Sequence, residues 1–397
     1  MIEIKDKSQC CGCAACVQRC PKLCISLKED KEGFLYPVVD KENCIDCGLC
    51  EKVCPELNVA QERVPLNVYA VKHKDEEIRM KSSSGGVFTL LAEQIIDEGG
   101  VVFGARFDES WEVMHDYTET KDGLAVFRGS KYVQSKIGNT YQQAEVFLKQ
   151  GRKVMFTGTP CQIAGLKRFL RKEYENLLAV DFVCHGVPSP KVWRMYLDET
   201  IAHQGFGKNT VLSHAMLRQK FIRDIKFRSK TTGWKKYSFA LTLTEAVAKG
   251  EENSVLLSSP FYENAFMQAF LSDYILRPSC YRCPVKSGKS SSDITIGDFW
   301  GIEKMLPEFD DDKGCGLILD YTSHSDVIKF FDWRYSTYAD ILAGNACIST
   351  SVKHPLNREF YFHRLEWNKS CIKTMEELQS KNWLMRVYRV LYRKLVK

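Results

Sequence analysis

The sequence lacks the features that mark membrane and secreted proteins. No uninterrupted apolar run among its 397 residues approaches the roughly 18 residues that a membrane-spanning helix needs. The opening residues, MIEIKDKSQC, contain no apolar stretch of the kind that a secretory signal peptide carries. We therefore expect a cytoplasmic protein.

A broad basic surface is missing as well. The formal net charge is +6, from 56 Lys and Arg against 50 Asp and Glu. Residues 381–397 alone hold six basic residues and no acidic one, so the rest of the chain is neutral. A neutral body argues against a nucleic-acid partner.

The basic tail has an apolar stripe of its own at helical spacing. We expect an amphipathic helix that packs on the body or on an acidic partner, with peripheral contact to the inner face of the membrane as the alternative. The stripe consists of Trp383, Leu384, Val387, Tyr388, Leu391 and Leu395.

Cysteine, in contrast, is abundant. The chain has 17 cysteines, and ten of them lie between Cys10 and Cys54. Disulfides are rare in a reducing compartment, so this crowding indicates metal binding. Two runs, CCGCAACVQRCP and CIDCGLCEKVCP, repeat the spacing Cys-x2-Cys-x2-Cys-x3-Cys-Pro. Bacterial ferredoxins bind cubane iron–sulfur clusters with this spacing.

In two-cluster ferredoxins the fourth cysteine of each run binds the other cluster. We therefore predict two [4Fe-4S] clusters, one on Cys10, Cys13, Cys16 and Cys54, and one on Cys44, Cys47, Cys50 and Cys20. Zinc is the alternative, but zinc sites usually use two separated cysteine pairs rather than three cysteines in steps of three. Cys11 and Cys24 fall outside the pattern and are interpreted as packing residues or spare thiols. Between the two cysteine runs, the stretch GFLYPVVDKENC predicts a short hairpin.

After the head, helical and strand patterns alternate, which predicts an α/β (α+β) body with mixed sheets behind a small ferredoxin-like domain. Helices are expected at 86–99, 140–151, 160–170 and 189–202, and strands at 101–107, 111–118, 152–158, 177–186, 292–301 and 315–323. Residues 224–230 and 237–245 look like strands of an inserted sheet.

Several stretches of the body together resemble a known family. They are SSSGGVFTLLAEQIIDEGGVVFGA, RGSKYVQSKIG, FTGTPCQIAGLK, DFVCHGVPSPKVW, RPSCYRCP and SDITIGDFWGIEK. Over roughly residues 65–330 the chain is similar to the beta subunits of coenzyme F420-reducing hydrogenase and formate dehydrogenase. The resemblance implies a bound flavin, usually FAD, at least one further cubane cluster beside it, and electron transfer between the clusters and an organic acceptor.

Three short stretches are the candidate flavin contacts. SSSGG precedes a helix, where hydroxyls and backbone amides suit a phosphate, although an ordinary serine N-cap is the alternative. GSKYVQS contains a cation, a phenol and an amide that could contact a phosphate or the flavin ring; the alternative is an ordinary strand with a solvated lysine. The tryptophan of GDFWG either stacks near the flavin or fills the core. With the resemblance, the predicted cofactor contacts are Ser84, Gly85, Gly86, Lys131, Tyr132, Gln134, Thr159, Asp298 and Trp300.

Four cysteines outside the head lie in the family-like stretches and are the candidate ligands of a third [4Fe-4S] cluster: Cys161, Cys184, Cys280 and Cys283. Two alternatives stay open: Cys161 as a low-pKa nucleophile at a helix N-terminus, and His185 as a ligand in place of Cys184. Cys315, Cys347 and Cys371 are interpreted as packing residues. The catalytic residues are unknown; His185 and Lys131 are the candidates for an acid or base.

We expect four segments: a 2[4Fe-4S] domain at 1–60, the two parts of the flavin module at 65–155 and 156–345, and a helical extension at 346–397. The predicted function is that of an iron–sulfur flavoprotein oxidoreductase, which relays electrons between the clusters and a flavin, and to or from deazaflavin or another small molecule. Its expected partner is a redox donor or acceptor protein. The alternatives are an electron-transfer subunit that serves a partner enzyme, and a non-catalytic cluster-bearing protein.

Overall fold

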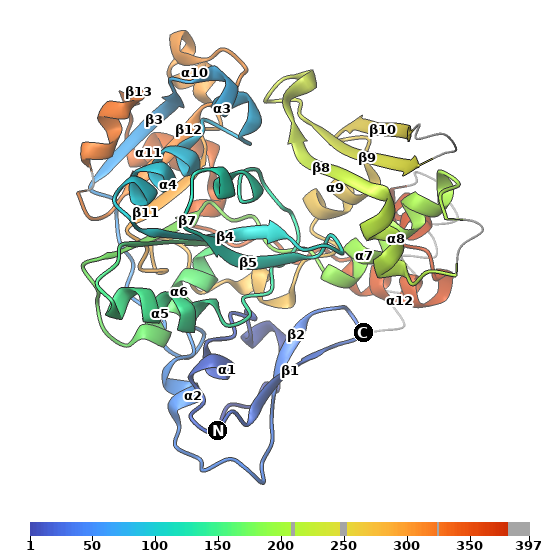
Figure 1. Cartoon of the computed structure of the whole chain (residues 1–397), viewed down its shortest axis with the longest axis horizontal. Helices are drawn as coiled ribbons and strands as arrows, with labels where there is room; N and C mark the ends of the chain where they lie inside the picture. Colours follow the sequence, from blue (N-terminus) through green and yellow to red (C-terminus); the bar gives the residue numbers. More distant parts are fainter. Residues whose placement is uncertain (208–210, 247–251, 324, 380–397) are drawn as a thin grey trace.

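The computed structural model describes residues 1–207, 211–246, 252–323 and 325–379 (Figure 1). The predicted fold class is confirmed, because a small ferredoxin-like head lies beneath a mixed α/β body. The predicted helix at 381–397 falls outside the described residues. Within these residues, no helix is both long enough and apolar enough to cross a membrane.

The head is built from two cysteine-bearing loops, each leading into a short helix, and one hairpin. Its elements are η1 (Lys7–Gln9), α1 (Ala15–Arg19), β1 (Ile25–Glu29), β2 (Leu35–Val39) and α2 (Leu49–Lys52). The hairpin starts earlier than predicted, because β1 precedes the stretch chosen from the sequence. Its turn is fixed by the Asp30 carboxylate, which accepts hydrogen bonds from the backbone N–H groups of Glu32 and Phe34 at 3.0 Å each.

The body is organised around one eight-stranded sheet in the order β13-β3-β12-β11-β7-β6-β4-β5. The four central strands β11, β7, β6 and β4 pair with one another in parallel. The other pairs are antiparallel: β5 with β4, β12 with β11 and β3, and β13 with β3. The strand bounds are β3 (Asn67–His73), β4 (Val101–Phe107), β5 (Val113–Thr118), β6 (Val154–Gly158), β7 (Leu177–Phe182), β11 (Ile294–Asp298), β12 (Gly316–Asp320) and β13 (Phe331–Tyr335). The predicted boundary between residues 155 and 156 lies inside β6, and strands from both sides of it share this sheet.

Helices cover both faces of the sheet. In β6, Val154 and Phe156 pack into the cluster beneath the sheet, whereas Met155 between them packs into the cluster on the opposite face. Both sets of side chains are therefore buried, which is why the parallel strands read as continuous apolar runs. The covering helices are α4 (Val87–Asp97) on one face and α5 (Thr140–Lys149) and α6 (Pro160–Leu170) on the other.

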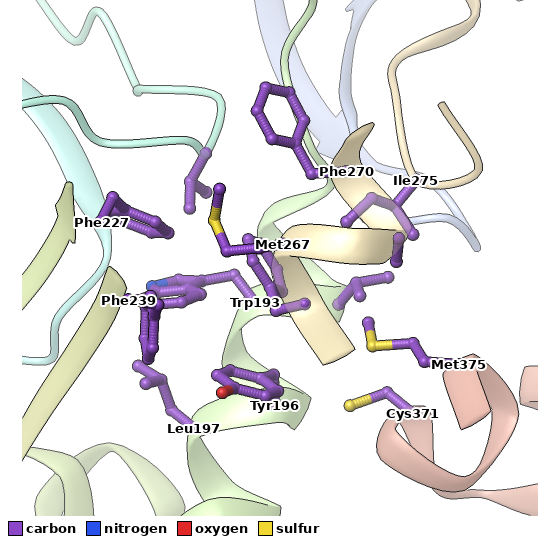
Figure 2. Close-up of a cluster of buried hydrophobic side chains, with 14 of the residues drawn as sticks. Trp193, Tyr196, Leu197, Phe227, Phe239, Met267, Phe270, Ile275, Cys371 and Met375 are labelled. Carbon is purple, nitrogen blue, oxygen red and sulfur yellow. The ribbon is translucent and has the colours of Figure 1, made fainter. Parts of the chain in front are cut away.

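A second core lies beside the large sheet, under the three-stranded antiparallel sheet β10-β9-β8 (Figure 1). Figure 2 shows Trp193 within this core among Phe227, Phe239 and Met267, with Cys371 close by. Its elements are α7 (Pro190–His203), α8 (His214–Phe221), β8 (Ile222–Ser229), η3 (Lys230–Thr232), β9 (Ser238–Ala246), β10 (Glu252–Pro260), α9 (Ala265–Leu271), α12 (Arg358–Asn368) and α13 (Cys371–Gln379). The predicted inserted sheet is thus present, with β10 as an additional strand.

The remaining elements are short, and most of them lie in the connections between strands of the large sheet. They are α3 (Glu76–Lys81), η2 (Asp122–Val126), η5 (Pro278–Arg282), α10 (Ile302–Met305), η6 (Pro307–Phe309), η7 (Ser325–Phe330), α11 (Tyr338–Gly344) and η8 (Ala346–Ile348).

Candidate functional site

Thiols of the first predicted set come from both cysteine runs and lie near one another. Burial, and after it the charges of the neighbouring Cys10 and Cys54, raise the pKa of Cys16 to about 12. Gly12 has a positive φ of 73° in this loop, and a Cβ there would lie 2.8 Å from both Arg277 Nη1 and Gln134 Nε2. The loop therefore requires glycine at this position.

The second set lies at the surface of the head. Cys20, Cys44, Cys47 and Cys50 line one cavity, and Cys47 is exposed. Cys24 lines the same cavity, with its Sγ 3.4 Å from the Sγ of Cys20. Cys24 is therefore a buried neighbour of the predicted ligands.

The third group is assembled by the register of the large sheet. Gly158 of β6 pairs with Asp181 of β7 in a parallel ladder. Cys161 and Cys184 each come three residues after this pair, so they leave the sheet at the same edge.

Cys280 reaches that edge through a short antiparallel contact. Arg277 N donates to Val187 O at 3.0 Å, and Val187 N lies 3.4 Å from the Cys280 Sγ and donates to it. Cys283 follows one turn later, at the end of η5.

The four thiols share a half-buried environment. Burial raises the pKa of Cys184 well above its ordinary value, Lys286 opposes the shift, and Cys280, Cys161 and Cys283 add to it. Lys286 is only 9% exposed, and its Nζ donates to the backbone oxygens of Cys184 and Cys347 at 2.6 and 2.7 Å. A buried cation thus accompanies four thiols that would carry negative charge when they bind metal.

Cys161 does not have the environment of an activated nucleophile. Thr159 caps α6 by a capping box with Gln162, and its Oγ1 lies 3.1 Å from the Cys161 Sγ. The neighbouring Cys11 and burial raise the pKa of Cys161 well above its ordinary value. A thiol held protonated in this way is a poor nucleophile. Cys11, interpreted as a packing residue or spare thiol, is buried against Cys161.

His185 uses both ring nitrogens elsewhere, which speaks against its replacing Cys184 as a ligand. Its Nε2 lies 2.7 Å from Asp273 Oδ1, and its Nδ1 lies 3.7 Å from the Cys347 Sγ. Burial alone would lower the pKa of His185, but Asp273 and Cys347 raise it to about 9. Cys347 was interpreted as a packing residue, yet it lines the cavity described below; Cys315 and Cys371 are buried in cores as predicted.

A buried polar network that the sequence did not reveal holds the loop before Cys161. His115 Nε2 donates to Thr157 O, and Ser135 Oγ lies 2.9 Å from His115 Nδ1. Gln162 Nε2 donates to Ser135 Oγ, while its Oε1 accepts from Thr159 N, both at 2.9 Å. Burial lowers the pKa of His115 to about 4, so the ring is neutral at pH 7.

The head docks on α6 and on Arg277. A Cβ on Gly165 would lie only 2.8 Å from the Cys13 Cβ, so the helix and the first cysteine loop touch closely. Arg277 is fully buried and donates to Cys10 O at 2.7 Å and to Leu35 O at 2.9 Å. Its Nη1 donates to Gln134 Oε1, and Gln134 Nε2 donates to Cys11 O.

A cavity of about 670 Å³ opens at the edge of the sheet where β6, β7 and β11 end. This is the edge at which α/β sheets bind ligands, and the volume is that of a typical ligand site. Eight of the nine predicted cofactor contacts line it: Ser84, Gly85, Gly86, Lys131, Tyr132, Thr159, Asp298 and Trp300. The ninth, Gln134, does not line the cavity, because its amide is engaged between the head and Arg277.

The serines of SSSGG do not cap α4, so the N-cap alternative is wrong. The N-cap is Gly86, with a φ of 87° and no side-chain bond to the helix. Ser84 Oγ instead donates to Cys315 O at 2.8 Å, and Ser83 Oγ accepts from Ser130 N at 2.7 Å. This last bond joins two of the predicted segments at the cavity wall.

Lys131 and Tyr132 contribute a cation and a ring to the same wall. Lys131 Nζ donates to the backbone oxygens of Phe127 and Arg128 at 3.3 Å each, and burial lowers its pKa to about 7. Tyr132 stacks on Phe270 with a ring separation of 4.7 Å.

The sequence missed the part of the wall that comes from the inserted sheet. Four residues of this segment line the cavity although none belongs to a predicted cofactor motif: Arg228 near the end of β8, Lys235, Tyr237 and Phe261. The segment carries no motif spacing, so only the fold assigns these residues to the site.

Comparisons with known proteins match three stretches of the chain. Residues 9–57 match the 4Fe-4S dicluster domain. Residues 68–140 match the N-terminal part, and residues 151–327 the C-terminal part, of the coenzyme F420 hydrogenase/dehydrogenase beta subunit.

Among solved structures, the chain is similar to one in the F420-reducing [NiFe] hydrogenase complex from Methanosarcina barkeri. The identity is 17%, the match covers 77% of this chain and 90% of that chain, and the TM-score is 0.43. A likeness at this level supports no conclusion about the site. A comparison with curated proteins found no match.

Proposed function

Because the chain belongs to the coenzyme F420 hydrogenase/dehydrogenase beta subunit family and carries a 4Fe-4S dicluster domain, we propose that it is an iron–sulfur flavoprotein oxidoreductase. In this proposal the head holds two [4Fe-4S] clusters, the body holds a third cluster and FAD, and the substrate is a small organic electron acceptor or donor. A bound flavin exchanges two electrons as hydride or one electron at a time, so it connects organic chemistry with one-electron clusters.

The observation that carries the proposal is the meeting of Cys161, Cys184, Cys280 and Cys283 at the edge of the sheet beside the cavity. They come from three separate segments, and their thiols lie close enough for the charges of Cys161, Cys280 and Cys283 to act on one another and on Cys184. Cubane clusters need such a set of four thiolates, and the adjacent buried Lys286 offsets their charge.

The cysteine sets also follow one another through the protein. Cys47, which is exposed, belongs to the second set. Cys50 of that set lies near Cys16 of the first set, because it adds to the rise in the pKa of Cys16 that burial chiefly causes. Cys13 in turn packs against α6, the helix that begins beside Cys161. Cys184 finally lines the cavity. This continuity supports a relay between a redox partner at the head and a substrate in the cavity.

FAD would be held by the predicted segments that converge on the cavity wall. The open first turn of α4 behind Gly86 offers backbone N–H groups for a phosphate, and Lys131 offers a charge. Trp300 lines the same cavity. The substrate is deazaflavin or another small molecule. An electron-transfer subunit that serves a partner enzyme is the second candidate, favoured by the exposed Cys47 of the head.

Anaerobic purification followed by iron analysis and cofactor extraction tests the proposal. We expect about twelve irons per chain, eight from the head and four from the third cluster, with about one extracted FAD. About eight irons would contradict the third cluster, and the absence of flavin would contradict the catalytic assignment and leave the electron-transfer role of the head.

A further inference from the structure

Arg228 on β8 has an unusual environment for a buried charge. The residue is 8% exposed and its side chain only 3%. Its Nη1 donates to Asp298 Oδ2, but its Nε and Nη2 have no hydrogen-bond partner. Burying guanidinium N–H groups without acceptors is costly, so these two donors indicate a missing ligand.

The two free donors lie on one edge of the guanidinium group. Nε–H and the N–H of Nη2 point in parallel, which is the fork that binds both oxygens of a carboxylate or of a phosphate. Asp298 cannot swing over to this edge, because its other oxygen accepts from Trp234 Nε1 at 2.9 Å. Arg228 lines the cavity, although its two unpaired nitrogens are themselves covered by neighbouring groups, so an anion would reach them only after those groups move aside.

The side chain is also held in place for this role. The guanidinium carbon lies 4.4 Å from the centre of the Tyr237 ring and 5.2 Å from that of Trp300. Trp300 is stacked on Trp234, at 4.8 Å between ring centres and 5° between planes. A cation fixed between rings loses little side-chain entropy when it binds an anion.

The surrounding wall suits an anion with an apolar body. Tyr237 stacks on Phe261 at 4.7 Å, and both line the cavity with Trp300. Lys230, two residues after Arg228, is buried and donates to the backbone oxygens of Arg79, Ser84 and Lys313. Within the described residues no carboxylate forms an ion pair with Lys230, whose three hydrogen bonds instead fix the turn that follows β8.

We propose that Arg228 is a specificity-determining residue that binds an oxyanion, a carboxylate or phosphate, of the organic substrate through its Nε and Nη2. The inserted sheet β10-β9-β8 is then the element that selects substrates, and Asp298 is the positioning residue that aims Arg228. The inference rests on the proposed function only in taking the bound anion to be the electron acceptor or donor.

The test is calorimetric binding of benzoate and phenyl phosphate, with neutral benzamide as reference, to anaerobically purified full-length protein. Arg228→Gln removes the charge and the fork, Arg228→Lys restores the charge alone, and Arg223→Gln removes the same charge from an exposed position on the same strand. We expect an anion to bind the wild type at least tenfold more tightly than Arg228→Gln, with Arg228→Lys in between and Arg223→Gln unchanged. Benzamide should not distinguish the four proteins.

Iron and flavin contents are measured on the same preparations. Unchanged contents in Arg228→Gln together with weakened anion binding support the inference. Loss of flavin in Arg228→Gln would overturn it, because Arg228 would then serve the cofactor. Equal anion binding in wild type and Arg228→Gln, or no anion binding by the wild type at millimolar concentration, would also overturn it. Failure of the proposed function would appear separately, as wild-type protein without flavin or with about eight irons.

Discussion

Replacing Arg277 with methionine should lower the reduction potential of the first head cluster. Arg277 is fully buried and donates to Cys10 O, and its Nη2 lies 3.6 Å from the Sγ of Cys10, a predicted ligand. Burial alone would lower the pKa of Arg277, but the negative charge on Cys10 raises it, so the cation and the thiolate stabilise each other. A reduced cluster carries one more negative charge, and it gains more from the cation than the oxidised cluster does.

The size of the effect follows from the hydrogen bonds that are lost. A hydrogen bond to a charged group contributes about 1.5–3 kcal/mol, and about 1.36 kcal/mol corresponds to 59 mV for a one-electron couple. If the whole contribution were specific to the reduced state, Arg277→Met would lower the potential by about 65–130 mV. This value is an upper limit, because the oxidised cluster also interacts with the cation.

A redox titration followed by electron paramagnetic resonance measures the shift. Arg194→Met is the matched control, since Arg194 joins the head to the body through Glu29 and Glu112 but contacts no predicted ligand. It removes a positive charge and a docking contact and should leave the potential within about 20 mV of wild type, because its charge is screened. Equal shifts in both variants, or no shift in Arg277→Met with its iron intact, would refute the reasoning.

Three further predictions concern the third cluster, a buried lysine and the second core. Cys161→Ser and Cys283→Ser should each lose about four of about twelve irons, while Cys371→Ser, altered in a hydrophobic core, should keep them all; equal iron in all three would contradict the ligand set. Burial lowers the pKa of Lys230 to about 7 in the folded protein. Between pH 7 and about pH 10 the unfolded chain therefore binds more protons than the folded protein, and the free energy of unfolding rises by up to about 1.4 kcal/mol per pH unit. The difference in thermal midpoint between wild type and Lys230→Met should therefore shift in favour of wild type from pH 7 to pH 9, and a constant difference would count against this. Trp193→Ala, at a fully buried position, should destabilise the protein by about 3–5 kcal/mol in thermal unfolding; a change under about 1 kcal/mol would show that this core does not contribute as described.

The sequence was sufficient for features that depend on local spacing. The cysteine runs fix the ferredoxin-like head, because a tight loop must place its thiols at set intervals. The buried strands β6 and β7 were visible as apolar runs, and Pro160 correctly indicated the start of α6.

Features that depend on distant parts of the chain were missed. Nothing local distinguishes Arg228 from any other arginine on a strand, because its free edge results from where Asp298 and the aromatic rings lie. Gln134 was assigned to the cofactor from its neighbours in sequence, but Arg277, 143 positions away, engages its amide. Cys347 likewise meets His185 only through the fold.

The exposed strand β10 was missed for a different reason. Its sequence, ENSVLLSSP, is largely polar, and most of its residues are not buried. It is held by its ladder to β9 rather than by a hydrophobic face, so its pattern carries little signal.

A stoichiometric reductive titration of the anaerobic protein tests the central claim most directly. The claim is that two head clusters, a third cluster on Cys161, Cys184, Cys280 and Cys283, and a flavin in the adjoining cavity form one redox unit. We expect uptake of about five electrons per chain, one for each cluster and two for the flavin, with bleaching of both cluster and flavin absorption. Uptake of about two electrons, with no change attributable to a flavin, would contradict it.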